Sequence, residues 1–203
     1  MIHQFQKALS ATSAAELRAA VDAPASTRLV SELISELRAH PEFDVALHPG
    51  ALSLSSFSRQ RPGASSESLV APALVEPDPK LRVDVRVLVW LSDSGAYEGG
   101  EVLIDEGGAI TRFRCQAGDA IAYPASARRS LTPVSRGELL LCTLEVQSLI
   151  AGEIERRVLL EFNRALREFE RRPESARHAE TMRRVCNELI RMWAVFPRRA
   201  SAP

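Results

Sequence analysis

The stretch Leu81-Arg-Val-Asp-Val-Arg-Val-Leu-Val-Trp-Leu91 alternates between two kinds of side chain. Every second residue from Leu81 to Leu91 is aliphatic, and the residues between them include Arg82, Asp84 and Arg86. Successive side chains of a β-strand point to opposite faces of its sheet. This period of two therefore predicts a strand with one purely apolar face and one face that carries charge.

Further short segments after Leu91 have the composition of β-strands and are separated by glycine-containing turns. Many short strands at regular spacing are typical of a β-sandwich or barrel, and the jelly roll is the natural candidate. The expected strands are Glu101–Ile104, Ile110–Arg114, Ala120–Tyr123 and Leu139–Val146.

Helical periodicity flanks this β-rich region on both sides. Ser13-Ala-Ala-Glu16 reads as a capping box, and a second helix is expected from Ser26 or Thr27 until His40-Pro41 stops it. After Gln147-Ser148 the pattern is helical again, with arginine and glutamate opposite an apolar stripe. We therefore predict an α+β fold with two parts, residues 1–148 for the N-terminal helices and barrel and residues 149–203 for a C-terminal helical extension.

The composition is that of an ordinary globular chain. Of 203 residues, 26 are Lys or Arg and 26 are Asp or Glu, so no excess charge points to nucleic acid or a membrane surface. The sequence has no apolar run of about 18 residues and no recognisable signal peptide. Its three cysteines show no zinc spacing and no disulfide framework. We expect a cytoplasmic protein with reduced thiols.

Several motifs resemble those of one family. Residues 123–137 read YPASARRSLTPVSRG, after YEGGE at 97–101 and AGD at 117–119. The tail contains VQSLIAGEIERRVLLEF and NELIRMWAVFP. Together these segments resemble the bacterial PKHD-type hydroxylases, iron(II)- and 2-oxoglutarate-dependent oxygenases of the prolyl-hydroxylase type. The resemblance implies a double-stranded β-helix, a cupin-like jelly roll, with buttressing helices.

The same resemblance puts other residues where the family has its cofactor ligands. The last iron-binding histidine falls on Arg129, and the upstream HxD pair falls on Leu69 and Ala71. The tyrosine that touches the co-substrate falls on Gln60, and the arginine that binds the far carboxylate of 2-oxoglutarate falls on Leu139. A guanidinium has no lone pair for a metal, and none of the four histidines lies between residues 52 and 144. We therefore expect no metal site, no catalytic residues, and loss of both iron and 2-oxoglutarate.

Three functions remain open for such a chain. The first is a pseudoenzyme in which the barrel is a scaffold and the C-terminal helices bind a partner, either a second copy or a related active subunit. The alternative is that the tail stripe is core packed on the barrel. The stripe consists of Ile154, Val158, Leu159, Phe162, Leu166 and Phe169, followed by Leu189, Met192 and Trp193.

The second possibility is a cationic pocket. Arg86 and Arg129 would lie near the old metal position, with Asp84 or Tyr123 close enough to pair, and would bind a small carboxylate or phosphate. Against it stands ordinary pairing of the arginines with Asp84 and Glu145, or exposure to solvent. The third possibility is an active dioxygenase with non-standard ligands, drawn for example from Asp84, Glu101 and Cys142.

Overall fold

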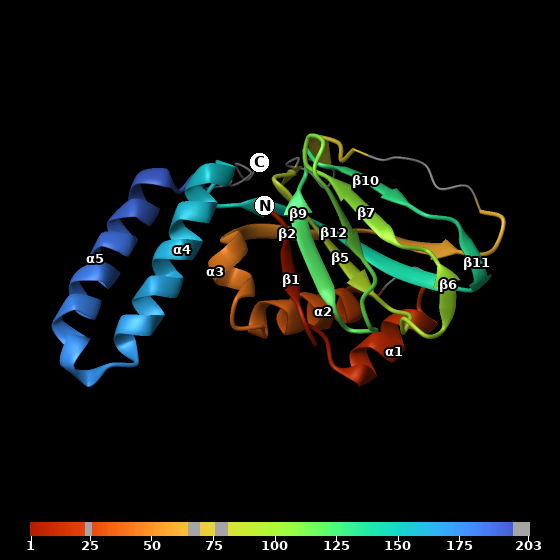
Figure 1. Ribbon diagram of the computed structural model, residues 1–203, viewed down its shortest axis with the longest axis horizontal. Coiled ribbons are helices and arrows are strands. Elements are labelled where there is room, and N and C mark those ends of the chain that lie inside the picture. Colours follow the sequence, from red (N-terminus) through yellow and green to blue (C-terminus); the bar gives the residue numbers. More distant parts are fainter. Residues whose placement is uncertain (23–25, 65–69, 76–80, 197–203) are drawn as a thin grey trace, which may run out of the picture.

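The computed structural model describes residues 1–22, 26–64, 70–75 and 81–196 (Figure 1). Its largest element is a five-stranded antiparallel sheet with the order β1-β9-β5-β12-β2. Residues 85–90 of the alternating stretch form the central strand β5 as predicted, but Leu81–Arg82 form a separate short strand in another sheet. The strands are β1 (His3–Phe5), β9 (Ala120–Pro124), β5 (Val85–Trp90), β12 (Leu139–Ser148) and β2 (Pro49–Gln60).

Shorter strands face one side of this sheet (Figure 1). Side chains from both layers interdigitate in one buried cluster that contains Leu88, Trp90, Val102, Ile104 and Leu139. The five-stranded sheet and a facing layer of smaller sheets close over a shared core and form a double-stranded β-helix, so the predicted α+β class and jelly-roll architecture are confirmed. The facing strands are β10 (Arg128–Leu131), β7 (Val102–Asp105), β8 (Ile110–Phe113), β11 (Val134–Gly137) and β6 (Tyr97–Gly99), and β3 (Leu74–Val75) pairs with β4 (Leu81–Arg82).

Three helices cover the other side of the five-stranded sheet: α1 (Ala11–Ala19), α2 (Thr27–Ala39) and α3 (Phe43–Leu47). Their buried leucines and phenylalanine pack on the aliphatic residues of β5 and β12. Ser26 caps α2 by accepting a hydrogen bond from the Leu29 amide, as predicted. For α1 the cap is Ser10 rather than Ser13, and the Ser13 amide donates to it.

The C-terminal helices project away from the barrel as a two-helix unit (Figure 1). Here α4 (Glu153–Glu170) packs against α3 on one side and α5 (Ala176–Trp193) on the other, with a short 3-10 turn, η1 (Pro173–Ser175), between α4 and α5. The two long helices bury a small core around Leu159 and Cys186. Although β12 ends where the predicted boundary falls, the division into two parts stays a prediction.

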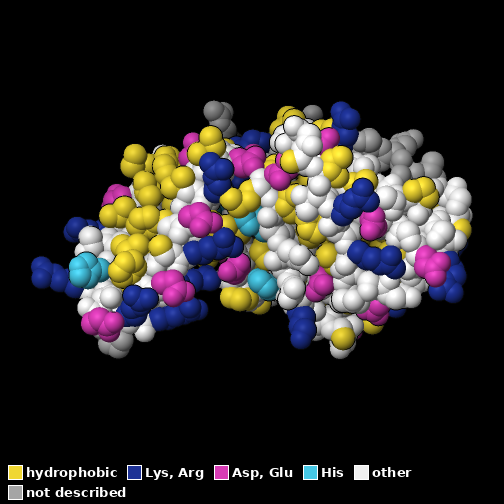
Figure 2. Space-filling model, in the orientation of Figure 1, with side chains coloured by type: hydrophobic (Ala, Val, Ile, Leu, Met, Phe, Trp, Pro, Cys, Tyr) yellow, Lys and Arg dark blue, Asp and Glu magenta, His cyan; other side chains and the backbone are white. Residues whose placement is uncertain are grey.

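The predicted apolar stripe of the tail divides between core and surface. Leu159 and Leu166 are buried, whereas Ile154, Val158 and Met192 are exposed. Figure 2 shows hydrophobic side chains gathered over the α4–α5 unit. Within the described ranges, no helix is long and apolar enough to cross a membrane.

Candidate functional site

A polar row crosses the interior face of the five-stranded sheet. In the strand register Tyr123 lies opposite Arg86, and Arg86 lies opposite Glu145, so β9, β5 and β12 each contribute one residue. Tyr123 and Glu145 are both 0% exposed, and Arg86 is 9% exposed. The next residues inward along β5, Leu88 and Trp90, are apolar. A charged row in such surroundings must satisfy its own hydrogen bonds.

Arg86 and Glu145 form a buried ion pair. The Arg86 Nε lies 3.0 and 3.1 Å from the two carboxylate oxygens of Glu145, and the Nη2 atom lies 2.7 Å from Oε1. Burial alone would lower the pKa of Arg86, but the hydrogen bonds and charge of Glu145 outweigh it and raise the pKa. Arg86 is therefore a charged and firmly held side chain.

Arg129 enters the same interior from the opposite layer. It lies on β10, where it pairs with Ile104 of β7, and it is 8% exposed. Its Nη1 atom donates to the Thr143 hydroxyl of β12 at 3.4 Å, the upper limit of a hydrogen bond. In the part of the chain that the structure describes, no carboxylate forms an ion pair with Arg129.

Tyr123 completes this group with a hydroxyl that has no hydrogen-bond partner among the described residues. Burial raises the pKa of Tyr123, while the charges of Arg129 and Arg86 lower it by a smaller amount. The hydroxyl is therefore protonated and can donate a hydrogen bond.

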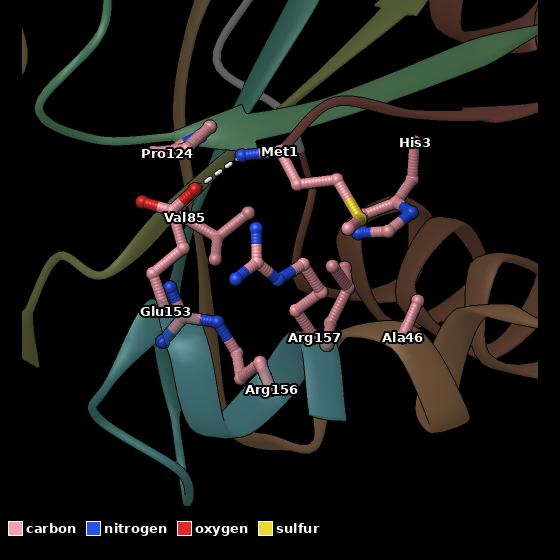
Figure 3. A pocket seen from close by; sticks show the side chains of 9 residues that line it. Met1, His3, Ala46, Val85, Pro124, Glu153, Arg156 and Arg157 are labelled. Carbon is pink, nitrogen blue, oxygen red and sulfur yellow. Dashed lines mark hydrogen bonds and ion pairs between the residues drawn. The ribbon is translucent and has the colours of Figure 1, made fainter. Parts of the chain in front are cut away.

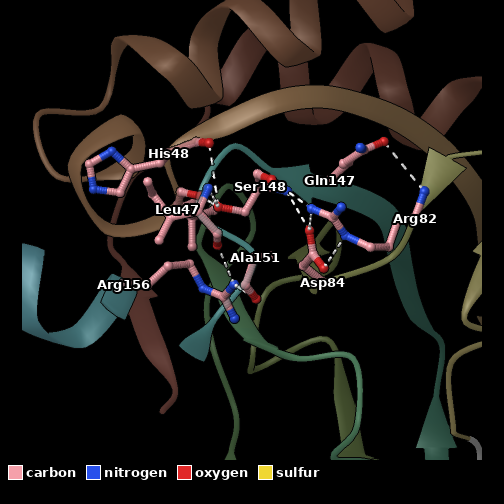
Figure 4. Close-up of polar contacts among 9 residues, drawn as sticks. Leu47, His48, Arg82, Asp84, Gln147, Ser148, Ala151 and Arg156 are labelled. Atoms are coloured by element: carbon pink, nitrogen blue, oxygen red, sulfur yellow. Dashed lines mark hydrogen bonds and ion pairs between the residues drawn. The ribbon is translucent and has the colours of Figure 1, made fainter. Parts of the chain in front are cut away.

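Asp84 does not join this group, although the sequence suggested that it could pair with Arg86 or Arg129. Its carboxylate accepts hydrogen bonds from Arg82 at 2.8 and 2.9 Å and from the Ser148 amide at 2.9 Å. Figure 4 shows this cluster at the end of the sheet, where Arg156 of α4 donates to the carbonyl groups of Ile150 and Ala151. Asp84 fixes the junction between the sheet and the tail.

The positions predicted to have carried cofactor ligands are spread over different surroundings. Gln60 ends β2 and pairs with Leu139 of β12, whose side chain is fully buried in the barrel cluster. Ala71 is half-buried and lies outside the strands, and Leu69 lies outside the described residues.

The non-standard ligand set considered from the sequence is not assembled. Asp84 is held by Arg82, Glu101 pairs with Arg112, and Cys142 packs on the helix side of the sheet. Across the described ranges, no group of three His, Cys, Asp or Glu residues could hold a metal ion. The residues that can be placed therefore do not fit an iron centre.

Sequence reasoning named Glu145 only as a possible partner and missed Thr143. A signal was present, because Glu145 is the single charged residue in the apolar run from Leu139 to Val146. A lone carboxylate in a buried strand needs a cation beside it.

A small cavity lies outside the barrel, where β1 meets α4 (Figure 3). Its lining includes His3, Val85, Arg156 and Arg157, and the amino group of Met1 pairs with Glu153. This cavity is part of the contact that attaches the tail.

No protein-family profile matches the chain. Among curated proteins, a PKHD-type hydroxylase of Paraburkholderia phytofirmans is 31% identical over 178 residues, covering 84% of this chain and 76% of that protein. A PKHD-type hydroxylase of Klebsiella pneumoniae is 28% identical over 172 residues, covering 84% of this chain and 77% of its own length.

Solved structures share the fold at low identity. A prolyl-4-hydroxylase from Pseudomonas putida aligns with a TM-score of 0.54 at 16% identity, covering 72% of this chain and 88% of that chain. HygX from Streptomyces hygroscopicus, with nickel and 2-oxoglutarate bound, aligns with a TM-score of 0.54 at 12% identity, covering 72% and 81%.

These comparisons correct one prediction. We expected iron and 2-oxoglutarate to be lost, but the curated relatives are named hydroxylases, and HygX structures hold iron, or nickel with 2-oxoglutarate. The prediction of no cofactors is therefore wrong as it stood, even though the described residues do not fit a metal. The 31% identity to a curated relative, over 84% of this chain and 76% of that protein, shows the family: the chain belongs to the PKHD-type hydroxylases.

Proposed function

We propose that this chain is a non-catalytic member of its family that works by association, through the exposed apolar surface of α4 and α5. We call this surface the tail band. The observation that carries the proposal is its exposure: Ile154 is 66% and Met192 is 73% exposed. The band consists of Ile154, Val158, Val185, Met192, Val195 and Phe196.

The position of the tail band supports an interface. It lies on the two-helix unit that projects from the barrel, and Figure 2 shows hydrophobic side chains gathered over that unit. Single exposed apolar residues are normal on a protein surface, but contiguous groups of them usually mark a contact with another molecule.

The occupant we propose is a second copy of the same chain. A two-fold interface uses one patch on both partners, so the patch must complement itself. The tail band is apolar, and neighbouring arginines and glutamates such as Arg191 and Glu188 occur in oppositely charged pairs. The chain has a formal net charge of zero, so two copies approach without general repulsion. A related active hydroxylase subunit is the alternative occupant.

The barrel interior supports the non-catalytic part of the proposal. Its described polar groups include Arg86 bound to Glu145, Arg129 in contact with Thr143 and the Tyr123 hydroxyl, and guanidinium groups provide no lone pair to a metal. A buried ion pair that uses both carboxylate oxygens also leaves Glu145 unavailable as a base.

Light scattering of the purified full chain tests the association. We expect a particle of twice the 22.3 kDa of one chain at tens of micromolar. The double variant Ile154→Asp/Met192→Asp should weaken the dimer roughly a hundredfold, because each buried carboxylate would lack a partner. Ile110→Asp is the matched control, since Ile110 is 60% exposed on β8 of the barrel.

A turnover assay tests the non-catalytic role. Because iron and 2-oxoglutarate are the cofactors found with this superfamily, both are supplied, and succinate formation is measured. We expect none above the protein-free rate. Succinate formation would contradict the non-catalytic role, and a monomer that also fails to bind a related hydroxylase would contradict association.

A further inference from the structure

Among the residues that the structure describes, the barrel interior contains more positive than negative charge. Of the described charged side chains in it, Arg86 is 9%, Glu145 is 0% and Arg129 is 8% exposed. Both oxygens of Glu145 are bound by Arg86. Arg129 is therefore a buried cation without a counter-charge among the described residues, a costly arrangement for a folded protein.

The same region also contains hydrogen-bond donors that lack a good acceptor among the described residues. The guanidinium of Arg129 has five N–H donors, and its one described side-chain contact is the 3.4 Å bond to Thr143. The hydroxyl of Tyr123, which is 0% exposed, has no partner in the described protein. Arg129 lies close enough for its charge to act on that hydroxyl. Two deeply buried donors thus share a region that offers them no good acceptor.

We propose that Arg129 and Tyr123 form a binding site for the carboxylate group of a small organic acid. One carboxylate has a single negative charge, which balances the charge of Arg129. Its two oxygens match the planar fork of a guanidinium, and the Tyr123 hydroxyl donates to one of them.

Two described carboxylates on or beside the neighbouring strands are already engaged elsewhere. Asp84 is held by Arg82 and the Ser148 amide, and Glu145 is held by Arg86. A phosphate dianion is a poorer match, because its second charge would exceed what Arg129 compensates. The carboxylate could belong to 2-oxoglutarate or to another acid, and the chemistry of the head group is the same for both.

Calorimetric titration of the full chain, in a chelating buffer that removes metal ions, tests the site with acetate, 2-oxoglutarate and inorganic phosphate. We expect saturable binding of a carboxylate, with phosphate at least about tenfold weaker. Arg129→Met should abolish that binding. Arg128→Met should leave it unchanged, because Arg128 is the exposed neighbour on the same strand. Binding of acetate that competes with 2-oxoglutarate identifies the head group as the ligand. Binding of 2-oxoglutarate alone identifies the larger acid.

Tyr123→Phe separates a binding role from a structural one. Because the hydroxyl makes no described hydrogen bond, its removal should leave the melting temperature of the free protein unchanged or slightly higher. Carboxylate affinity should nevertheless fall roughly tenfold. Arg129→Met should raise the melting temperature of the free protein, since it removes an uncompensated charge. The site is overturned if no carboxylate binds the wild type saturably, if Arg129→Met binds as well as the wild type, or if phosphate binds more tightly than acetate.

Discussion

The two faces of the five-stranded sheet bury different kinds of side chain. On the helix side, Val87 and Leu144 are both fully buried among leucines of α1, α2 and α3 and Phe43 of α3. On the barrel side, their chain neighbours are charged: Glu145 is as deeply buried, and Arg86 is 9% exposed. The helix side stabilises the sheet through apolar area. The barrel side contributes little net stability through its ion pair, because desolvation offsets the attraction between the charges.

The helix side of the sheet determines the fold, and the barrel side holds the polar groups on which any chemistry depends. Aliphatic packing on the helix side is enough to specify the sheet, whatever polar groups the interior carries. The interior can therefore change its residues while the fold is retained, and the sequence predicts one such change, Arg129 where the family motif has a histidine.

The largest effect is expected from breaking the interior ion pair. Glu145→Leu leaves Arg86 buried without a partner and close to a second cation, Arg129, so the free energy of unfolding should fall by about 3–5 kcal/mol. Urea denaturation measures it. The double variant Arg86→Met/Glu145→Leu should regain most of that loss, because it removes both charges. A double variant as unstable as Glu145→Leu would show that the pair contributes net stability.

A cavity on the helix side should lower the free energy of unfolding somewhat less than the broken ion pair does. A second substitution should not restore that lost stability. Leu144→Ala is expected to lower the free energy of unfolding by about 2–5 kcal/mol through lost burial and the void left behind. Glu145→Leu is the matched comparison, because Leu144 and Glu145 are neighbours on one strand and their side chains point to opposite faces of the sheet. Adding Val87→Ala should increase the loss rather than restore stability. If Val87→Ala instead restored the free energy of unfolding, the two faces of the sheet would not differ in how they stabilise the protein.

Much of the fold could be predicted from periodicity. The alternation from Leu81 to Leu91 predicted β5 and its apolar face, and Ser26 predicted the start of α2. Strand β1 was not predicted, because a strand of three residues at the sheet edge has no measurable period.

The site was harder to predict because pairing depends on register. Sequence spacing brought Arg86 and Asp84 together, but the antiparallel register of β5 and β12 puts Glu145 opposite Arg86. The 3.4 Å contact between Arg129 and Thr143 joins two sheets, and no pattern within one strand reports it. The register also explains why Arg82, rather than Arg86, holds Asp84 at the end of the sheet.

The smallest effect concerns a half-buried titratable group at the edge of the helix side. His48 follows α3 in a left-handed conformation (φ 44°), and its Nε2 atom has no hydrogen-bond partner in the described chain (Figure 4). Burial, and then the charge of Arg156, lower the pKa of His48 below its ordinary 6.5, with Asp44 opposing. Burial likewise lowers the pKa of His3.

Because the folded protein resists protonating these two histidines, their contribution to stability is complete above about pH 6.5 and declines as the pH falls toward their lowered values. We expect the free energy of unfolding to drop by about 1 kcal/mol or a little more between pH 7 and pH 5. His48→Asn should reduce that drop, since asparagine tolerates the left-handed conformation and does not titrate. His3→Asn/His48→Asn should nearly abolish it. Glu36 and Glu138 do not interfere, because their pKa values are lowered from 4.5 and they titrate below this window. An unaltered pH dependence in the double variant would assign the effect to other groups.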